Sequence, residues 1–429
     1  MRKTFLRLCI LYTAFMIPAA AVAAEVALTL DEAVTIALRD NRDVRLKEQE
    51  LKKAKAAIAE AKAGLFPGLD VSAGWYDTRG LYSKDVANYS TQIGAAQLLF
   101  DGGRVLNAVK VGEHYYAANE AALDAARQAL VQAVKKSFYA LMFADRYCLL
   151  NKQILDNTQE HLNVAESRFA KGEASESDIL EITASLENVR QAYDISANQS
   201  RSAQALLANL LYLDADVSIK TTGEFTYTPL ELAYDEAFLK ALKQRPEIKQ
   251  LAEQRKASEK AVAIAKGGSK PVVSASWNYY SGSRLGTATA VGASPVKGWN
   301  DYNVLGVTAQ WPLFDGWLTR SKVEQALIDV KQATLLEERA VKDIALELTN
   351  AFLALQEAVG QLRAAETEIA YYTLHFATVQ DRFRKGMASS LDVNDAEIKQ
   401  KIALFNKTQA LFDYSIAKSD FEKATGGKK

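Results

Sequence analysis

The sequence predicts a mainly α-helical protein with a transmembrane β part, in which a unit of long coiled-coil helices and one β-hairpin occurs twice. The first observation is a repeat. A Leu-Phe-Asp-Gly tetrapeptide at positions 99–102 recurs at 313–316, and an Arg-Phe-x-x-Gly motif at 168–172 recurs at 382–386. Both offsets are 214 residues, and two landmarks that keep their spacing in this way indicate a duplicated structural unit.

The second observation is the distribution of proline. The 429 residues include 7 prolines, and none lies between Pro67 and Pro229 or after Pro312. Helices in those two stretches contain no proline that would break them. We therefore expect them to exceed the globular average of about 11–12 residues.

Residues 1–24 have the features of a secretory signal peptide: three basic residues, an apolar run and small residues before Glu25. The alternative is a short membrane anchor, for which the apolar run is too short. Without this leader, 49 basic and 52 acidic residues remain, which gives no basic surface for nucleic acid. One of the 2 cysteines also remains, Cys148, for which we expect a buried helical position.

Each predicted repeat, residues 25–228 and 229–429, begins with two short helices. An Asp-Glu-Ala motif at 31–33 recurs at 235–237, and Thr29 or Asp31 is placed to cap the first helix. This offset is 204 residues before the hairpins and 214 after them. The second hairpin therefore contains ten more residues than the first.

The segments at about 68–100 and 271–314 are predicted to be β-hairpins. Apolar residues alternate with small or polar ones in both, over about ten residues per strand, which is typical of a transmembrane strand. An ordinary half-buried hairpin of a soluble domain shows the same alternation. The predicted leader and the aromatic residues near the strand ends favour the membrane.

A long helix pair is expected after each hairpin, at about 104–213 and 318–424. The outgoing helix of some 65 residues would be roughly 100 Å long. Apolar residues recur at three- and four-residue spacing, as in a coiled-coil seam. They are Leu130, Val134, Phe138 and Leu141 in the first repeat and Ile344, Leu348, Phe352 and Leu355 in the second.

Four membrane strands cannot close a barrel, because even the smallest barrels need about eight. Unpaired strand edges are not tolerated in lipid, so a chain with four such strands must share its barrel with further copies. Three copies would supply twelve strands.

At this point the chain resembles the TolC-like outer membrane efflux protein family. The shared features are the order and duplication of the Leu-Phe-Asp-Gly turns with Arg104 and Arg320, the Arg-Phe-x-x-Gly tips, and the acidic residues behind them. The resemblance implies a homotrimer in the outer membrane lipid of a Gram-negative cell, with a 12-stranded β-barrel continued by an α-helical barrel into the periplasm. It also implies an exit duct for efflux or type I secretion, with a periplasmic adaptor (membrane fusion protein) and an inner-membrane pump of the RND, ABC or MFS type as partners.

The resemblance implies an acidic gate at the periplasmic mouth. Asp392 and Asp395 match the acidic residues after the second tip, and Asp178 and Glu181 stand at the equivalent positions of the first repeat. Three copies would place six carboxylates from the second repeat around one constriction, which attracts cations. Asp392 has an equally good interpretation as a helix-capping residue with Ser389, whereas Asp395 has no such local role.

The resemblance also assigns the tips of the helix pairs to adaptor docking. These residues are Lys171, Gly172 and Glu173 in the first repeat and Lys385, Gly386 and Met387 in the second. The alternative is a plain helix–helix turn with glycine at the C-cap. Ala388 departs from the family pattern, which often has a basic latch residue there, so Arg384 or Lys385 is a candidate replacement.

The sequence contains no enzyme signature and predicts no cofactor. His114, His161 and His375 are scattered along predicted helices and have no metal-ligand spacing. The alternative function is a soluble periplasmic coiled-coil adaptor, which would also have a leader and long helices. It would not explain two pairs of alternating strands.

Overall fold

The computed structural model describes residues 25–81, 84–173, 175–214, 217–230, 233–285, 297–388 and 390–427. The predicted signal peptide lies outside these described residues. The chain forms two compact units, one of Met1–Thr35 with Ser137–Glu224 and one of Ile36–Lys136 with Phe225–Lys429, and the longest helix of the first repeat contributes to both. Each unit is described by itself.

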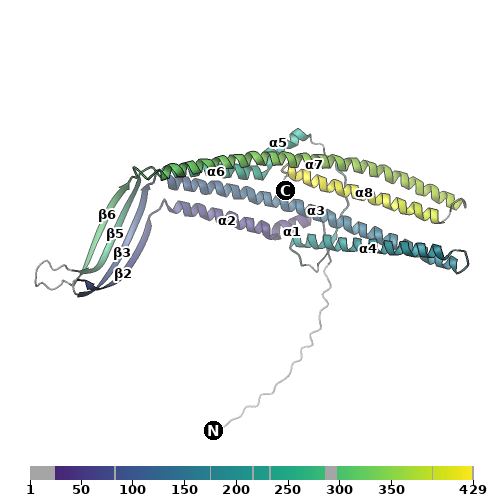
Figure 1. The fold of residues 1–429 in the computed structure, drawn as a ribbon, viewed down its shortest axis with the longest axis horizontal. Coiled ribbons are helices and arrows are strands. Elements are labelled where there is room, and N and C mark those ends of the chain that lie inside the picture. Colours follow the sequence, from purple (N-terminus) through teal and green to yellow (C-terminus); the bar gives the residue numbers. More distant parts are fainter. Residues whose placement is uncertain are drawn as a thin grey trace, which may run out of the picture. The chain divides into compact units, whose positions relative to one another are not determined.

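Both predicted repeats contain two short helices, two long strands and a pair of long helices in the same order (Figure 1), and the first also contains two four-residue strands. The elements up to residue 221 are β1 Glu25–Leu28, α1 Leu30–Asp40, α2 Arg42–Ala63, β2 Gly68–Leu81, β3 Lys84–Phe100, α3 Arg104–Phe169, α4 Glu176–Leu211 and β4 Ser218–Thr221. They are followed by α5 Tyr234–Gln244, α6 Pro246–Gly267, β5 Val272–Leu285, β6 Lys297–Gln310, α7 Leu318–Arg384 and α8 Ser390–Ala424.

Local capping explains where the short helices begin. Thr29 and Glu32 form a reciprocal capping box at the start of α1, because the Thr29 N–H donates to Glu32 at 2.9 Å and the Glu32 N–H to the Thr29 hydroxyl at 3.4 Å. Asn41 caps α2 in the same way by accepting from Asp43 N–H at 2.9 Å. Its counterpart before α6 is Arg245, which has no capping hydrogen bond.

Arg245 instead ties together the end of the chain and the long helix α7. Its guanidinium is buried and donates to Glu247 at 2.9 Å, to Glu347 at 2.5 Å and to the carbonyl of Ala424 at 3.5 Å. Burial opposes its charge, and the two carboxylates more than offset this, so the pKa of Arg245 is raised.

The four long strands form one antiparallel sheet in the order β2-β3-β5-β6 (Figure 1). The hairpin of the first repeat and that of the second are joined through the pairing of β3 with β5. Strands β2 and β6 are the two edges of this sheet within the chain.

Helices α7 and α8 pack along each other through an apolar seam. The buried residues of α7 alternate at four- and three-residue spacing, which is the periodicity of a coiled coil. They are Ile344, Leu348, Ala351, Leu355, Ala358, Leu362 and Ala365. Tyr414 and Phe421 are the largest side chains that α8 buries against them.

One small sheet was not expected from the sequence. Strands β1 and β4 pair in parallel, with Glu25 opposite Ser218 and Leu28 opposite Thr221. The Thr222 N–H and hydroxyl both donate to the Leu28 carbonyl at 2.9 Å and extend the pairing. Four-residue strands without alternation carry no signal in sequence, because their pairing is decided by partners far along the chain.

The predicted fold class is confirmed in its duplicated long helices and its two hairpins. None of the helices that the structure describes combines the length and hydrophobicity needed to cross a bilayer.

Candidate functional site

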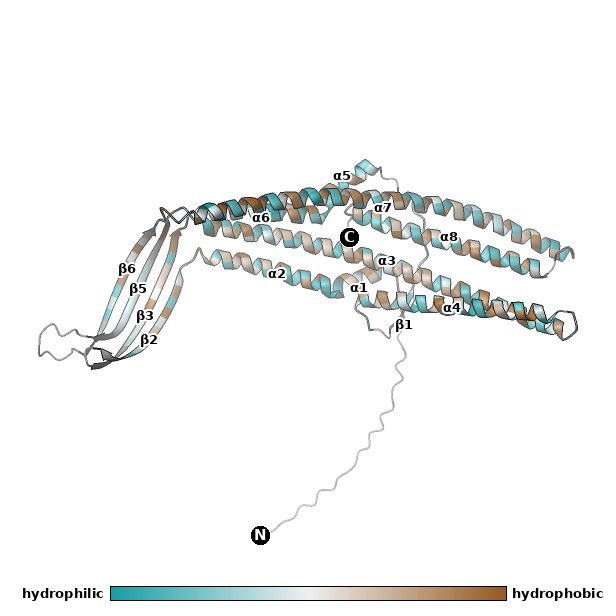
Figure 2. Ribbon diagram, in the orientation of Figure 1, coloured by the Kyte–Doolittle hydropathy of each residue, from teal (hydrophilic) through white to brown (hydrophobic). Residues whose placement is uncertain are grey.

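One face of the four-stranded sheet is apolar across all four strands. Leu69, Ala95, Trp277 and Leu305 lie opposite one another in successive strands. Leu69 is 79% exposed and Leu305 80%, so this face is not covered within the chain. The same face carries Val71, Trp75, Ile93, Val273, Ala275, Tyr279, Val307 and Ala309. Figure 2 shows the alternation of hydrophobic and hydrophilic residues along these strands.

The opposite face of the sheet is polar. The Gln92 amide donates to the Asn278 side-chain oxygen at 3.0 Å across β3 and β5. Gly94 lies between Asp70 and Asn278, and a Cβ at this glycine would lie 2.7 Å from the Asp70 carboxylate. A side chain there would displace these polar groups. The sheet therefore has the two-sided character of a wall between lipid and water.

Aromatic residues mark both ends of the apolar face. At the far end, the Trp299 indole N–H donates to Ser281 at 2.6 Å. At the helical end, the Trp311 indole N–H donates to the Ser269 carbonyl at 3.0 Å. The twelve residue steps from Trp299 to Trp311 span about 40 Å in extended conformation, or roughly 28 Å at a tilt of about 45°. That height fits the hydrocarbon layer of a membrane.

The Leu-Phe-Asp-Gly turns convert strand into helix in both repeats. Asp101 accepts from the backbone N–H groups of residues 103–105 at 2.6–3.0 Å and so caps α3. Asp315 does the same for α7 through Thr319 N–H at 2.9 Å, and the hydroxyl and N–H of Thr319 hold the pKa of Asp315 below its usual value. Asp101 is 7% exposed, whereas Asp315 is exposed.

The two helical tips have the same backbone geometry. The Glu173 N–H donates to the Arg168 carbonyl and the Met387 N–H to that of Arg382, both at 2.9 Å. Gly172 and Gly386 have φ of 74° and 73° and complete a Schellman motif in each case. The six residues predicted for adaptor docking, Lys171, Gly172, Glu173, Lys385, Gly386 and Met387, are exposed.

The predicted gate residues lie directly behind these tips. Asp392 is in the first turn of α8, and Asp395 follows one turn later on the same side of the helix; both are exposed. Glu181 is exposed on α4. Asp178 lies in the first turn of α4, and its side chain falls outside the described part of the structure. The acidic residues of α8 and those of α4 belong to different compact units.

Two cations stand beside the second tip, where the latch was expected. The Lys385 ammonium lies 2.6 Å from the Asp381 carboxylate, and Arg384 donates to the Gln380 amide at 3.5 Å. Both partners lie one turn back on α7. Exposed pairs of this kind contribute little to stability, so these cations are available to a partner at low cost.

The histidines and the cysteine form no metal centre. His114 lies 2.7 Å from Glu253, and His375 stacks on Tyr371 at a centroid distance of 6.0 Å. Cys148 is a free, half-buried thiol. No group of three His, Cys, Asp or Glu side chains within the described ranges is arranged to hold a metal ion.

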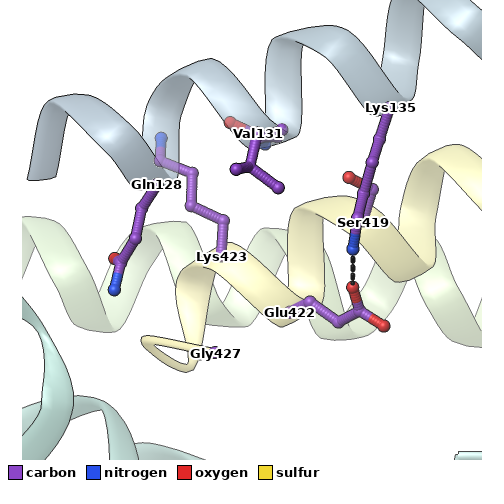
Figure 3. Close-up of a pocket in the computed structure, with 8 residues that line it drawn as sticks. Gln128, Val131, Lys135, Ser419, Glu422, Lys423 and Gly427 are labelled. Carbon is purple, nitrogen blue, oxygen red and sulfur yellow. Dashed lines mark hydrogen bonds and ion pairs between the residues drawn. The ribbon is translucent and has the colours of Figure 1, made fainter. Parts of the chain in front are cut away.

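A pocket of about 70 Å³ opens between α3 and α8 (Figure 3). Lys135 pairs with Glu422 at 2.7 Å, and Lys423 pairs with Glu347 at 3.3 Å. The buried Ser419 hydroxyl has no hydrogen-bond partner in the described structure.

Comparison with known proteins agrees with this architecture. The family model described as outer membrane efflux protein matches residues 33–211 and 238–427, one block in each predicted repeat. Among curated relatives, the cation efflux system protein CusC of Escherichia coli is 23% identical over 393 residues, which cover 90% of this chain and 82% of CusC. The toluene efflux pump outer membrane protein TtgC of Pseudomonas putida is 22% identical over 430 residues, covering 93% of this chain and 83% of TtgC.

Solved structures show the same fold. The outer membrane channel CmeC of Campylobacter jejuni has a TM-score of 0.78 at 18% identity, over 93% of this chain and 85% of that chain. The outer membrane channel MtrE of Neisseria gonorrhoeae, solved in its open state, has a TM-score of 0.74 at 20% identity, over 93% of this chain and 89% of that chain. These proteins are named as efflux components and channels and not as enzymes, in line with the expectation for this chain. The chain is an outer membrane protein, and it belongs to the outer membrane efflux protein family.

Proposed function

We propose that three copies of this chain form the exit duct of a tripartite efflux or type I secretion system. The duct conducts substrate passively from an inner-membrane pump to the outside. The observation that carries the proposal is the sheet, with an uncovered apolar face, a polar face and two open edges.

The open edges support a shared barrel. Strands β2 and β6 have no partner on their outer sides among the described strands, and lipid does not tolerate unpaired backbone groups. Pairing β6 of one copy with β2 of the next satisfies both edges. Three copies then close twelve strands, with the polar faces lining the lumen.

The acidic gate is the second part of the proposal. Exposed Asp392 and Asp395 follow the second tip, and three copies bring six such carboxylates to one mouth. Cations are attracted to such a ring and anions are repelled. Glu181 and Asp178 would add a second acidic set.

Planar-bilayer conductance of detergent-extracted protein tests both parts. We expect discrete, small, cation-selective channels from the wild type. The variant Asp392→Ala/Asp395→Ala should conduct more and select cations less. The matched control, Asp178→Ala/Glu181→Ala, removes the same charge from the first repeat and separates the two sets.

If Asp392→Ala/Asp395→Ala leaves the channels unchanged, the proposed duct stands and Asp392 is a helix-capping residue. Well-folded protein that forms no channels would contradict the duct itself. It would favour a soluble periplasmic adaptor, which leaves membranes in mild buffer, whereas a barrel requires detergent.

The partners follow from the tips. We propose that a periplasmic adaptor docks on Lys171–Glu173 and Lys385–Met387 and links the duct to a pump of the RND, ABC or MFS type. Photo-cross-linkers at Glu173 and Met387 should capture such an adaptor in intact cells. A cross-linker at exposed Lys342, in the middle of α7, is the control and should not.

A further inference from the structure

The two strand-to-helix turns differ at one position in a way that local structure does not explain. Gly103 follows the first Leu-Phe-Asp-Gly turn with φ of 83°, and Trp317 occupies the equivalent place after the second with φ of 66°. Such a backbone conformation is open to glycine and strained for a bulky side chain. Tyr212 is the other non-glycine residue with positive φ among the described residues.

The strain at Trp317 is not offset within the turn. Trp317 is the N-cap residue of α7, but its side chain makes no capping hydrogen bond, and Asp315 supplies the cap instead. The indole is 64% exposed and packs edge-on against exposed Phe314, at a centroid distance of 5.3 Å. A strained, exposed aromatic pair points to a contact outside the chain.

The residues around Trp317 indicate contact with an anionic partner. Arg320 and Lys322 are exposed, and neither has an ion-pair partner among the described residues. The first repeat has Leu106 and Ala108 at these places. The first turn has one ring, Phe100, and one cation, Arg104, which donates to the Asp101 carbonyl at 3.0 Å, whereas the second turn combines two rings with two cations.

A second copy of the chain is the competing occupant, and the first repeat argues against it. A Cβ at Gly102 would lie 2.9 Å from the Gly267 carbonyl and 2.8 Å from Lys270, so α6 covers this position. A Cβ at Gly103 would meet only Asn107 of its own helix, at 3.6 Å. If copies assemble as the repeats do, a neighbour covers Gly316 and leaves Trp317 facing outward.

We propose that Trp317, with Phe314, Arg320 and Lys322, anchors the chain in the phospholipid headgroup layer of the periplasmic leaflet. This rests on the proposed function, because it takes the sheet to span the outer membrane. The indole and the Phe314 ring lie among glycerol and headgroup atoms, where amphipathic aromatic rings concentrate. The two cations pair with lipid phosphates. Each of these pairs contributes to membrane binding about as much as other ionic contacts at a membrane surface.

Depth-dependent fluorescence quenching tests the anchor in the assembled protein. Single-tryptophan variants that keep either Trp317 or Trp277, with the other four tryptophans changed to Phe, are reconstituted into phosphatidylethanolamine–phosphatidylglycerol vesicles. A headgroup nitroxide should remove more Trp317 emission than a nitroxide deep in the acyl chain. Trp277, from the middle of the apolar face, should show the reverse order.

The two tryptophans make the failures distinguishable. If Trp277 is quenched from the acyl chains and Trp317 by neither lipid label, the anchor is wrong and the membrane-spanning sheet stands. If aqueous iodide does not quench Trp317 fluorescence either, a second copy of the chain covers this residue. If neither tryptophan is quenched by lipid, the proposed function fails as well.

Two further measurements keep the test independent of the single-tryptophan background. In otherwise wild-type protein, Trp317→Phe should lower the headgroup-dependent quenching, and the quenching that remains comes from Trp299 and Trp311 at the two ends of the apolar face. Arg320→Gln/Lys322→Gln should reduce the quenching of Trp317 in anionic vesicles and leave it unchanged in neutral phosphatidylcholine. Equal quenching of this variant and the wild type in both vesicles would contradict the role of the cations.

Discussion

The α7–α8 pair and the α3–α4 pair are built on the same repeat, but their seams have different chemistry. The α7–α8 pair is apolar at buried Ala351, Leu362, Ala365, Ala410 and Tyr414 and at half-buried Val359. Their equivalents 214 residues earlier are Ser137, Asp145, Cys148, Asn151, Ser196 and Ser200. The periodicity is the same in the two pairs, but the polarity differs at these six positions.

Several of these polar side chains are hydrogen-bonded within the described structure. The Ser200 hydroxyl donates to Asp145 at 2.5 Å and joins α4 to α3. Asn151 donates to the Tyr147 carbonyl at 2.9 Å, and buried Ser137 has no partner for its hydroxyl. Buried polar contacts contribute less net stability than buried hydrocarbon, and they fix pairing geometry. We infer that α3–α4 is the pair more easily opened.

The largest expected effect comes from Tyr414→Ala. This tyrosine is 1% exposed, donates to the Thr228 carbonyl and packs on the Tyr227 ring at 4.9 Å. Removing it should cost about 3–5 kcal/mol of local stability. Ser200→Ala, at the equivalent position of α4, should cost only about 0.5–1.5 kcal/mol. Native-state hydrogen exchange of α8 and α4 peptides measures both.

Leucines shared by the two seams provide the control for this difference. Leu141→Ala and Leu355→Ala remove the same side chain at equivalent positions and should each cost about 2–5 kcal/mol. Equal costs for Tyr414→Ala and Ser200→Ala, with normal leucine controls, would contradict the contrast between the pairs.

A second prediction concerns making the α3–α4 seam apolar, like the α7–α8 seam. Asp145→Val/Ser200→Ala removes a half-buried carboxylate and its hydroxyl partner together, so no polar group is left unpaired. Hydrogen exchange in α4 should slow, with a gain of about 1–3 kcal/mol. Faster exchange would mean that the polar contact, and not packing, holds this pair together.

The pH dependence of the same contact has a defined sign. Burial raises the pKa of Asp145 above its ordinary value of 3.8, and the Ser200 hydrogen bond partly opposes this. The neutral carboxyl is therefore favoured in the folded state. Its contribution is complete below pH 3.8 and is lost as the pH rises through the raised pKa. Relative to Asp145→Asn, the wild-type α3–α4 pair should lose exchange protection as the pH rises above 3.8 and through the raised pKa of Asp145.

The smallest effect concerns the helix starts, where the repeats also differ. Thr29 caps α1, whereas Ala233 precedes α5 and supplies no side-chain hydrogen bond. Thr29→Ala should destabilise the first turn of α1 by about 0.5–2 kcal/mol, and Ala233→Thr should protect α5 by a similar or smaller amount. Amide exchange in these two first turns provides the comparison. No change in either would mean that tertiary contacts alone hold these helices.

Much of the fold was predictable because its signals are local. The helix boundaries at Arg104 and Leu318 follow from an Asp-Gly turn, and those near Phe169 and Arg384 from a glycine with positive φ. Strand alternation predicted which residues share a face of the sheet. For the candidate site, the sequence could also place Asp392 and Asp395 behind a tip. It did not by itself indicate that the backbone at Trp317 is strained. The clue was that the equivalent residue of the first repeat is a glycine, Gly103.

Periodicity, turns and the duplication are properties of neighbouring residues, and for this reason the sequence was sufficient for them. The pairing of β1 with β4, the burial of Arg245 against Glu347, and the cover that α6 provides for Gly102 but not for Gly316 depend on residues far apart in the chain. The two Leu-Phe-Asp-Gly turns have the same sequence but different surroundings, because only the first of them is followed by a second repeat within the chain. Its first turn is enclosed by the second repeat, while its second turn and its outer strand edges are left uncovered.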